Sequence, residues 1–175
     1  KSIDVKKIII IRKIILSTII ACILIILLLF IYFSFINKNF SLGVFETYLR
    51  FNDDWGTQRG YTWIRCLQLF ASMNFKSMLF GIGPDTLAPV IYDYCGDETN
   101  IIFEGTYIDS AHNEYIQYLL TLGIFGLCAY LFLVFTLIKK IIKYRNTEPL
   151  ILIFGASIFC YLIQAFVNIA QPINT

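Results

Sequence analysis

The sequence predicts an all-α polytopic membrane protein with three transmembrane helices and a long polar loop that contains an amphipathic interfacial helix. Composition is the first reason: 58% of the 175 residues are hydrophobic, only 15% are charged and the mean hydropathy is +0.71. A soluble domain of this length has too little interior to bury so much apolar surface. The second reason is that three apolar segments reach the roughly 20 residues that a helix needs to cross a bilayer.

The three apolar segments run from Ile14 to Ile36, from Tyr115 to Ile138 and from Leu150 to Ile169. They divide the chain into a basic end with the first helix (1–36), a loop (37–114), a second helix (115–138), a basic loop (139–149) and a third helix (150–169). The first segment is too long for the core of a signal peptide, so we expect it to be retained. The chain begins without Met and ends soon after the third segment, so we expect a piece of a longer polytopic protein, truncated after residue 175.

Basic residues are unevenly distributed and predict the orientation of these helices. They cluster before the first helix and after the second, at Lys1, Lys6, Lys7, Arg12, Lys13, Lys139, Lys140, Lys143 and Arg145. The loop over 37–114 holds five basic and ten acidic residues. Since loops rich in Lys and Arg stay in the cytoplasm, the acidic loop is predicted to be extracytoplasmic. The net charge of +2 therefore gives no indication of a nucleic-acid partner.

Within the loop, residues Arg59 to Leu79 alternate apolar and polar side chains at helical spacing, which predicts an amphipathic helix. Its aromatic residues and basic stripe favour a position along the outer membrane interface. The turn Gly81-Ile-Gly-Pro84 should end this helix, because glycine lowers helix propensity and proline lacks a backbone donor. Residues 85–109 follow as an acidic, tyrosine-rich loop, which suits sugar stacking but is as typical of a plain structured loop.

Two arginines and a tryptophan make the amphipathic helix a candidate for substrate binding. Arg59 opens the helix four residues before Trp63, so the two should share a face of its first turn. A guanidinium next to free helix N-terminal amides offers a two-pronged site for pyrophosphate. Arg65, on the polar stripe, is a second phosphate candidate. The alternative is that Arg59 only reaches lipid headgroups, and the pattern leaves this open.

His112, the only histidine, lies where the polar loop turns into the second apolar segment. We expect Ser110 or Asp109 to cap a helix that begins near His112, with the imidazole in its first turn. Gly123 follows eleven residues later, close to three helical turns, and Gly123 and Gly126 would let another helix pack closely on that face. The histidine could instead serve only to anchor a helix at the membrane interface.

The cysteines and the short motifs indicate neither a metal nor a cofactor. Cys22, Cys128 and Cys160 lie in apolar segments and are expected to pack as small apolar side chains. Cys66 and Cys95 lie in the loop, and whether they pair is left open. The sequence has no C-x-x-C spacing, no nucleotide-binding glycine loop and no H-E-x-x-H motif.

Four short motifs resemble those in the C-terminal portion of the O-antigen ligase and O-antigen polymerase family of membrane glycosyltransferases. In chain order they are Arg59-Gly-Tyr-Thr-Trp63, Gly81-Ile-Gly-Pro-Asp85, Ala111-His-Asn-Glu-Tyr-Ile-Gln117 and Gly123-Ile-Phe-Gly126. The spacing from His112 to Gly123 is also typical of this family. The similarity extends from about Thr57 to Ile138.

The resemblance implies glycan transfer from an undecaprenyl-pyrophosphate-linked donor to a hydroxyl of a lipid or glycan acceptor, at the outer face of the bacterial cytoplasmic membrane. Carried over to this chain, Arg59 would bind the departing pyrophosphate and His112 would orient or deprotonate the acceptor hydroxyl. Asn113 and Glu114 would position His112 or contact sugar. The family also relies on basic residues earlier in its chains, so this piece alone is expected to be inactive.

A second interpretation is a non-catalytic membrane component, such as a subunit for polysaccharide export or transport that binds sugar through the aromatic loop. It predicts movement of glycan without consumption of lipid-linked donor. The predicted helices carry no deep ionisable residue and no proline break, which are common marks of a transport path, although these marks could lie outside this piece.

Overall fold

The computed structural model describes residues 5–168, and within that range it contains helices and turns but no strand. The predicted all-α class is confirmed. Three helical segments are long and apolar enough to cross a membrane: Lys6–Ile36, Gly123–Tyr144 and Leu150–Val167. The chain divides into two compact units, Lys1–Gly60 and Tyr61–Thr175.

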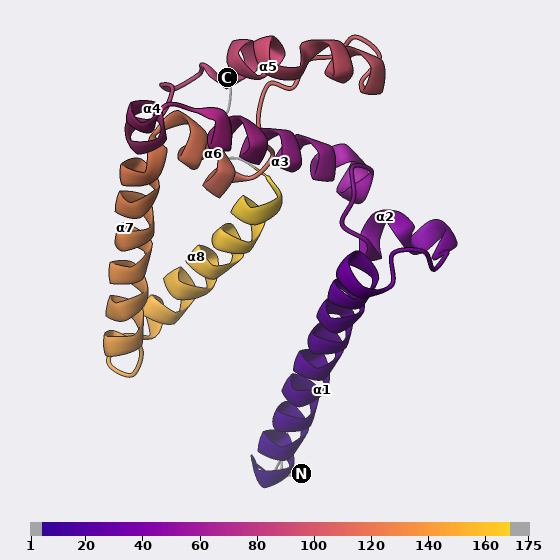
Figure 1. Cartoon of the computed structure of the whole chain (residues 1–175). Coiled ribbons are helices and arrows are strands. Elements are labelled where there is room, and N and C mark those ends of the chain that lie inside the picture. The colour runs from indigo at the N-terminus through magenta and orange to yellow at the C-terminus, as the bar shows by residue number, and fades with distance from the viewer. Residues whose placement is uncertain (1–4, 169–175) are drawn as a thin grey trace. The chain divides into compact units, whose positions relative to one another are not determined.

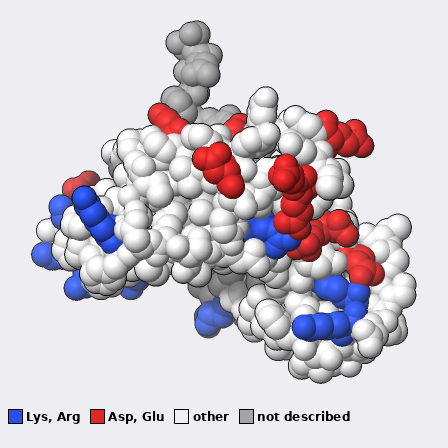
Figure 2. Space-filling view, turned by 45° about the horizontal axis from the view of Figure 1, so that its top comes forward, with Lys and Arg blue, Asp and Glu red and all other residues white. Residues whose placement is uncertain are grey.

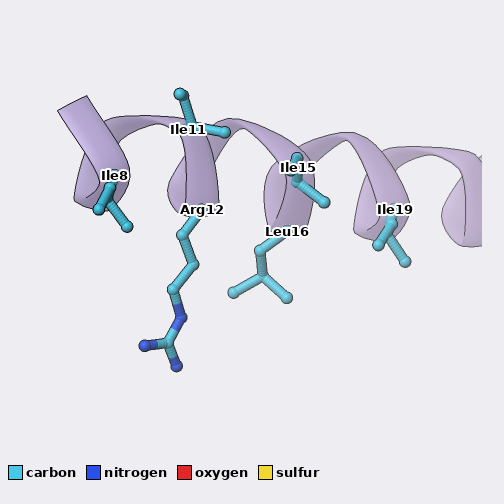
Figure 3. A pocket seen from close by; sticks show the side chains of 6 residues that line it. All are labelled: Ile8, Ile11, Arg12, Ile15, Leu16 and Ile19. Carbon is cyan, nitrogen blue, oxygen red and sulfur yellow. The ribbon is translucent and has the colours of Figure 1, made fainter. Parts of the chain in front are cut away.

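The first unit is built on α1 (Val5–Ile31), which continues through a π-helical turn at Tyr32–Ile36 (Figure 1). Its isoleucines and leucines are exposed along the helix, as expected of a helix that meets lipid. Figure 3 shows a shallow hollow on α1 whose lining side chains all come from this one helix: Ile8, Ile11, Arg12, Ile15, Leu16 and Ile19. The hollow is a gap between neighbouring side chains on the surface of one helix.

The remainder of the first unit folds back on the end of α1. A 3₁₀ turn at Gly43–Phe45 leads into α2 (Glu46–Leu49). The Oγ of Ser34 accepts a hydrogen bond from the amide of Phe51 at 2.8 Å. The Trp55 ring then packs against Phe30, with ring centroids 5.8 Å apart. These contacts fix the chain on α1 just before it reaches Arg59.

The second unit joins several helices through one small core. Its helices are the later part of α3 (Trp55–Ser72), α4 (Phe75–Phe80), α5 (Leu87–Ile102), α6 (Glu114–Thr121), α7 (Gly123–Tyr144) and α8 (Pro149–Val167). The core consists of Tyr61, Cys66, Leu69, Leu87, Ile91, Ile108, Ala111 and Leu120. It therefore packs α3 and α5 against α6 and against the segment just before His112.

The two long helices of this unit, α7 and α8, form a hairpin that is joined by the turn at residues 145–148 (Figure 1). The short helix α6 contacts both of them and bridges the end of the hairpin away from that turn. The N-terminal end of α6 meets the C-terminal end of α8, where the Nδ2 of Asn113 donates to the carbonyl of Phe166 at 2.9 Å. The start of α6 is consequently held at one end of the hairpin.

The sequence predicts one continuous second helix, but the structure divides this segment into two helices. Instead of running from Tyr115 to Ile138, the chain ends α6 at Thr121 and starts α7 at Gly123, whose φ of +71° breaks the helix. The reason is tertiary. The carbonyls of Leu120 and Thr121 accept hydrogen bonds from the amides of Ile82 and Gly83, at 2.9 and 3.0 Å. The two carbonyls thus bond to amides of the turn after α4, instead of to amides of a continuing helix.

Two glycines allow this backbone crossing. A Cβ on Gly81 would lie 2.2 Å from the carbonyl oxygen of Thr121, and one on Gly123 would lie 2.4 Å from that of Leu79. Both glycines also have positive φ, which other residues rarely adopt. The close approach expected at Gly123 is therefore present, and the partner is the turn that ends α4.

The predicted amphipathic helix from Arg59 to Leu79 is interrupted. α3 ends at Ser72, and α4 begins at Phe75 because the side chain of Asn74 caps it by accepting from the amide of Ser77 at 2.9 Å. The expected stop at the glycine turn is confirmed, since Gly81 is the C-cap of α4 with φ +79°.

The other boundaries also differ from the expected ones. Residues 85–109 were expected as a loop, but they contain α5, which is kinked at Cys95. α8 ends at Val167, and the predicted end of the third helix at Ile169 lies outside the described residues.

Replacement of Gly123 by Ala should destabilise the protein by about 3 kcal/mol, because the new methyl group overpacks a backbone crossing and strains a left-handed residue. Gly105→Ala is the matched control: Gly105 also has positive φ (+86°), but a Cβ there meets nothing within 4 Å. It should cost only about 1 kcal/mol. Thermal unfolding of the purified protein in detergent measures both, and equal losses would contradict the importance of the crossing.

Candidate functional site

His112 lies in a strained turn that precedes α6. Its φ is +47°, a left-handed conformation that is uncommon for residues other than glycine. The expectation that His112 sits in the first helical turn with Ser110 or Asp109 as cap is wrong. α6 begins at Glu114, and the Asn113 side chain is its cap, accepting from the amide of Ile116 at 3.1 Å.

His112 borders a cavity of about 240 Å³ in the second unit. The cavity is lined by Thr62, Phe103, Thr106, Tyr107, Ile108, Asp109, Ser110 and His112. The Oγ of Ser110 donates to the Oδ1 of Asp109 at 3.0 Å, which orients that carboxylate. Hydroxyl groups, a carboxylate and aromatic rings in one small cavity provide what a sugar ring requires, namely polar partners for its hydroxyls and apolar faces for its C–H groups.

Asn113 and Glu114 directly follow His112 in the chain and face the protein interior. Both are buried, with about 2% of each residue exposed. The Glu114 carboxylate lies between α6 and α8, where the Tyr161 hydroxyl is 2.6 Å from each of its oxygens. Trp63 is also buried, and its ring packs edge-on against Phe166 of α8 with centroids 5.4 Å apart. All three predicted site residues thus contact α8.

Arg59 belongs to the first unit and follows an unusual backbone segment. Gly56, Thr57 and Gln58 all have positive φ, so α3 is irregular until it reaches Arg59. The Nη1 of Arg59 donates to the carbonyl of Gly56 at 2.9 Å and lies 3.3 Å from the Oγ1 of Thr57. Among the described residues, its buried Nε has no hydrogen-bond partner. The guanidinium therefore retains donor capacity for an anion.

Gly60 fixes the backbone next to Arg59. A Cβ at this position would lie 1.8 Å from the carbonyl oxygen of Asn52, so no other residue fits without a backbone shift. Gly60 therefore allows the chain to pass close to Asn52, and this path sets the backbone position of the neighbouring Arg59.

Arg65 is engaged in a structural ion pair. Its guanidinium binds the Glu98 carboxylate, with Nε 2.9 Å from Oε2, and Nη1 donates to Gln68 at 3.0 Å. It also stacks over the Tyr61 ring at 4.8 Å. The hydrogen bond from Arg65 holds the pKa of Glu98 below its ordinary value. This pair connects α3 to α5, and it occupies the donors that a phosphate would need.

The described residues contain no group of three or more His, Cys, Asp or Glu side chains that could hold a metal ion. The five cysteines are free thiols. Burial raises the pKa of the Cys66 thiol to about 12, which makes it a poor nucleophile. Figure 2 shows several acidic side chains on the viewed face.

The sequence predicts His112 and its neighbours as site residues, but it does not indicate the residues that distant elements place beside them. Thr62 lies on α3 and Phe103 just after α5, and both line the cavity with His112. Tyr161 and Phe166 lie on α8 in an apolar segment where no local pattern distinguishes them. The tyrosine-rich composition before His112 was the only signal, and it does indicate Tyr107.

The Arg65–Glu98 pair predicts a pH dependence of stability. The pKa of Glu98 is lower in the folded protein than its ordinary value of 4.5. The ion pair therefore stabilises the fold at pH values above 4.5, and this stabilisation is lost as the pH falls through the folded-state pKa. Glu98→Gln should lower the melting temperature at neutral pH, and the difference from wild type should shrink on acidification. Asp97→Asn, which removes a neighbouring exposed carboxylate, should keep the wild-type acid dependence. A constant gap between Glu98→Gln and wild type from pH 7 to pH 3 would contradict this.

Comparison with known proteins identifies a family for this chain. A family model described as O-antigen ligase matches residues 5–131, which include both Arg59 and His112. Searches of curated proteins and of solved structures found no significant match. Since the model covers well over half of the chain, and the three apolar helices make it a membrane protein, the chain belongs to the O-antigen ligase family, whose members carry out glycan transfer of the ligase or polymerase type.

Proposed function

We propose that this chain contributes the acceptor-activating part of a membrane glycosyltransferase that moves a glycan from an undecaprenyl-pyrophosphate-linked donor to a lipid or glycan hydroxyl. The observation that carries the proposal is the cavity of about 240 Å³ that His112 lines together with Asp109 and several hydroxyl side chains. In a chain of the O-antigen ligase family, such a cavity is suited to one sugar ring of the acceptor.

In the proposed reaction, the acceptor hydroxyl attacks the anomeric carbon of the donor. The new C–O bond forms as the bond from that carbon to the pyrophosphate breaks, and its electron pair leaves with undecaprenyl pyrophosphate. His112 accepts the hydroxyl proton as general base. The neighbouring Asp109, oriented by Ser110, would hydrogen-bond a second hydroxyl and fix the acceptor ring.

Arg59 is the proposed partner of the leaving pyrophosphate. Negative charge develops on that group as the bond breaks, so a guanidinium that is already in place lowers the barrier. Two features support the assignment: the backbone next to Arg59 is fixed by Gly60, and its Nε has no partner within the described part of the chain. A planar cation with several donors matches a pyrophosphate better than a lysine would.

The contacts of the four other candidate residues, Trp63, Arg65, Asn113 and Glu114, favour structural or positioning roles over substrate binding. Asn113 and Glu114 are buried and bonded to neighbouring helices, which supports a positioning role over sugar contact. Trp63 packs on Phe166 and would act in the same way. Arg65 is paired with Glu98, which favours a structural role over phosphate binding.

The proposed orientation places the His112 end of the second unit outside the cytoplasm. The opposite end of the α7–α8 hairpin carries Lys139, Lys140, Lys143 and Arg145. Basic residues mark the cytoplasmic side of membrane proteins. The His112 cavity would then open at the outer face, where an undecaprenyl-linked donor is available after export.

In cells that lack the endogenous gene, full-length protein with His112→Ala or Arg59→Ala should lower glycan assembly at least about 100-fold at matched membrane expression, as expected for loss of a general base or a charge-stabilising group. Lipid-linked donor should accumulate. Lys76→Ala removes an exposed cation of α4 and should leave assembly unchanged. Extraction and sizing of the polymer and of the lipid-linked intermediates measures both.

The size of the accumulated lipid-linked intermediates distinguishes a polymerase from a ligase. Single repeat units indicate a polymerase, and long lipid-linked chains indicate a ligase. Normal assembly with both alanine variants would contradict the proposal and favour the export or transport role, in which donor is moved but not consumed.

A further inference from the structure

The left-handed conformation of His112 requires support from its surroundings, because a residue with a Cβ does not adopt it without cost. The segment before His112 is held by the amide of Ala111, which donates to the Oε1 of Gln117 at 2.9 Å. Ala111 itself is fully buried in the core of the second unit. This hydrogen bond connects the residue before His112 to α6.

The other side of the turn is held by α8. The Asn113 side chain serves two helix ends at once: its Oδ1 caps α6 at the amide of Ile116, and its Nδ2 donates to the carbonyl of Phe166 at 2.9 Å. The Tyr115 hydroxyl donates to the carbonyl of Leu162 at 3.1 Å.

Glu114, between them, supplies the strongest contact. Its buried carboxylate accepts from the Tyr161 hydroxyl, which is 2.6 Å from both oxygens. Hydrogen bonds to a carboxylate are short and strong, and in a buried site the loss of a donor is costly. Three consecutive residues after His112 are thus bonded to the last two turns of α8.

We propose that α8 is the element that sets the position of His112, with Tyr161 and Asn113 as its positioning residues. This inference rests on the proposed role of His112 and assigns a task to a helix that lies beyond the region matched by the family model. Displacement of α8 would release the bonds to residues 113–115, let the turn relax and move the imidazole away from the acceptor hydroxyl.

The test uses full-length protein with Tyr161→Phe, which removes one hydroxyl and keeps the ring. Ser157→Ala is the matched control, because it removes a hydroxyl from the same helix that bonds only to Ile153 within α8. A second variant, Asn113→Ser, keeps an oxygen to cap α6 but loses the donor to Phe166. Each protein is assayed for kcat and for the KM of the lipid-linked donor. Each is also labelled with ¹⁵N-histidine for NMR, with the His112 signal assigned by its loss in His112→Gln.

We expect Tyr161→Phe and Asn113→Ser to lower kcat about 10- to 100-fold, as for a misplaced catalytic group, with the KM of the donor unchanged. The His112 signal should shift in both variants, and Ser157→Ala should match wild type in every measurement. An unchanged kcat or an unchanged His112 signal in Tyr161→Phe would overturn the positioning role and leave the proposed function intact. Full activity of His112→Ala would instead overturn the proposed function, while a shifted His112 signal in Tyr161→Phe would still show that α8 sets the conformation of the histidine.

Discussion

The backbone crossing between the turn after α4 and the junction of α6 with α7 determines the arrangement of the second unit. Two main-chain hydrogen bonds, from Ile82 to Leu120 and from Gly83 to Thr121, replace bonds that a straight helix would make. Buried carbonyls must be satisfied, so the helix can end at Thr121 only because these amides are present. The break turns α6 across the end of the α7–α8 hairpin, and this places the residues before α6 at the cavity.

The polar contacts of residues 113–115 gather at the C-terminal end of α8. Polar bonds are sparse along the described apolar helices, but at the C-terminal end of α8 several converge on residues 113–115. Helix ends leave carbonyls without partners, and the Asn113 amide uses one of them, at Phe166, while it caps α6. One side chain thereby links the termini of two helices, directly after His112 in the chain.

Different contacts hold the backbone around the two candidate catalytic residues, Arg59 and His112. Arg59 follows three left-handed residues and precedes a glycine that packs against the Asn52 carbonyl, so local backbone geometry defines its path. The residues on either side of His112 are bonded to Gln117 of the adjoining α6 and to Phe166 of α8, which is distant in sequence. In both cases strained backbone lies next to a functional candidate, as is common where a side chain must be held in one orientation. Arg65 differs, because its pairing with Glu98 makes it part of the scaffold between α3 and α5.

The sequence alone determined the all-helical membrane class, because composition and the length of apolar segments depend only on the chain, and it indicated the family through the motifs around Arg59, Gly81, His112 and Gly123. Helix propensity and periodicity could not show that the second apolar segment breaks at Gly123, since the bonds that end α6 come from residues 82 and 83. They also could not show that Asn113, and not Ser110 or Asp109, caps α6. An Asn cap is favoured here because its amide also reaches the Phe166 carbonyl, and that carbonyl is brought near only when α8 packs against α6. Tertiary packing therefore decided the conformation of His112 and the walls of its cavity.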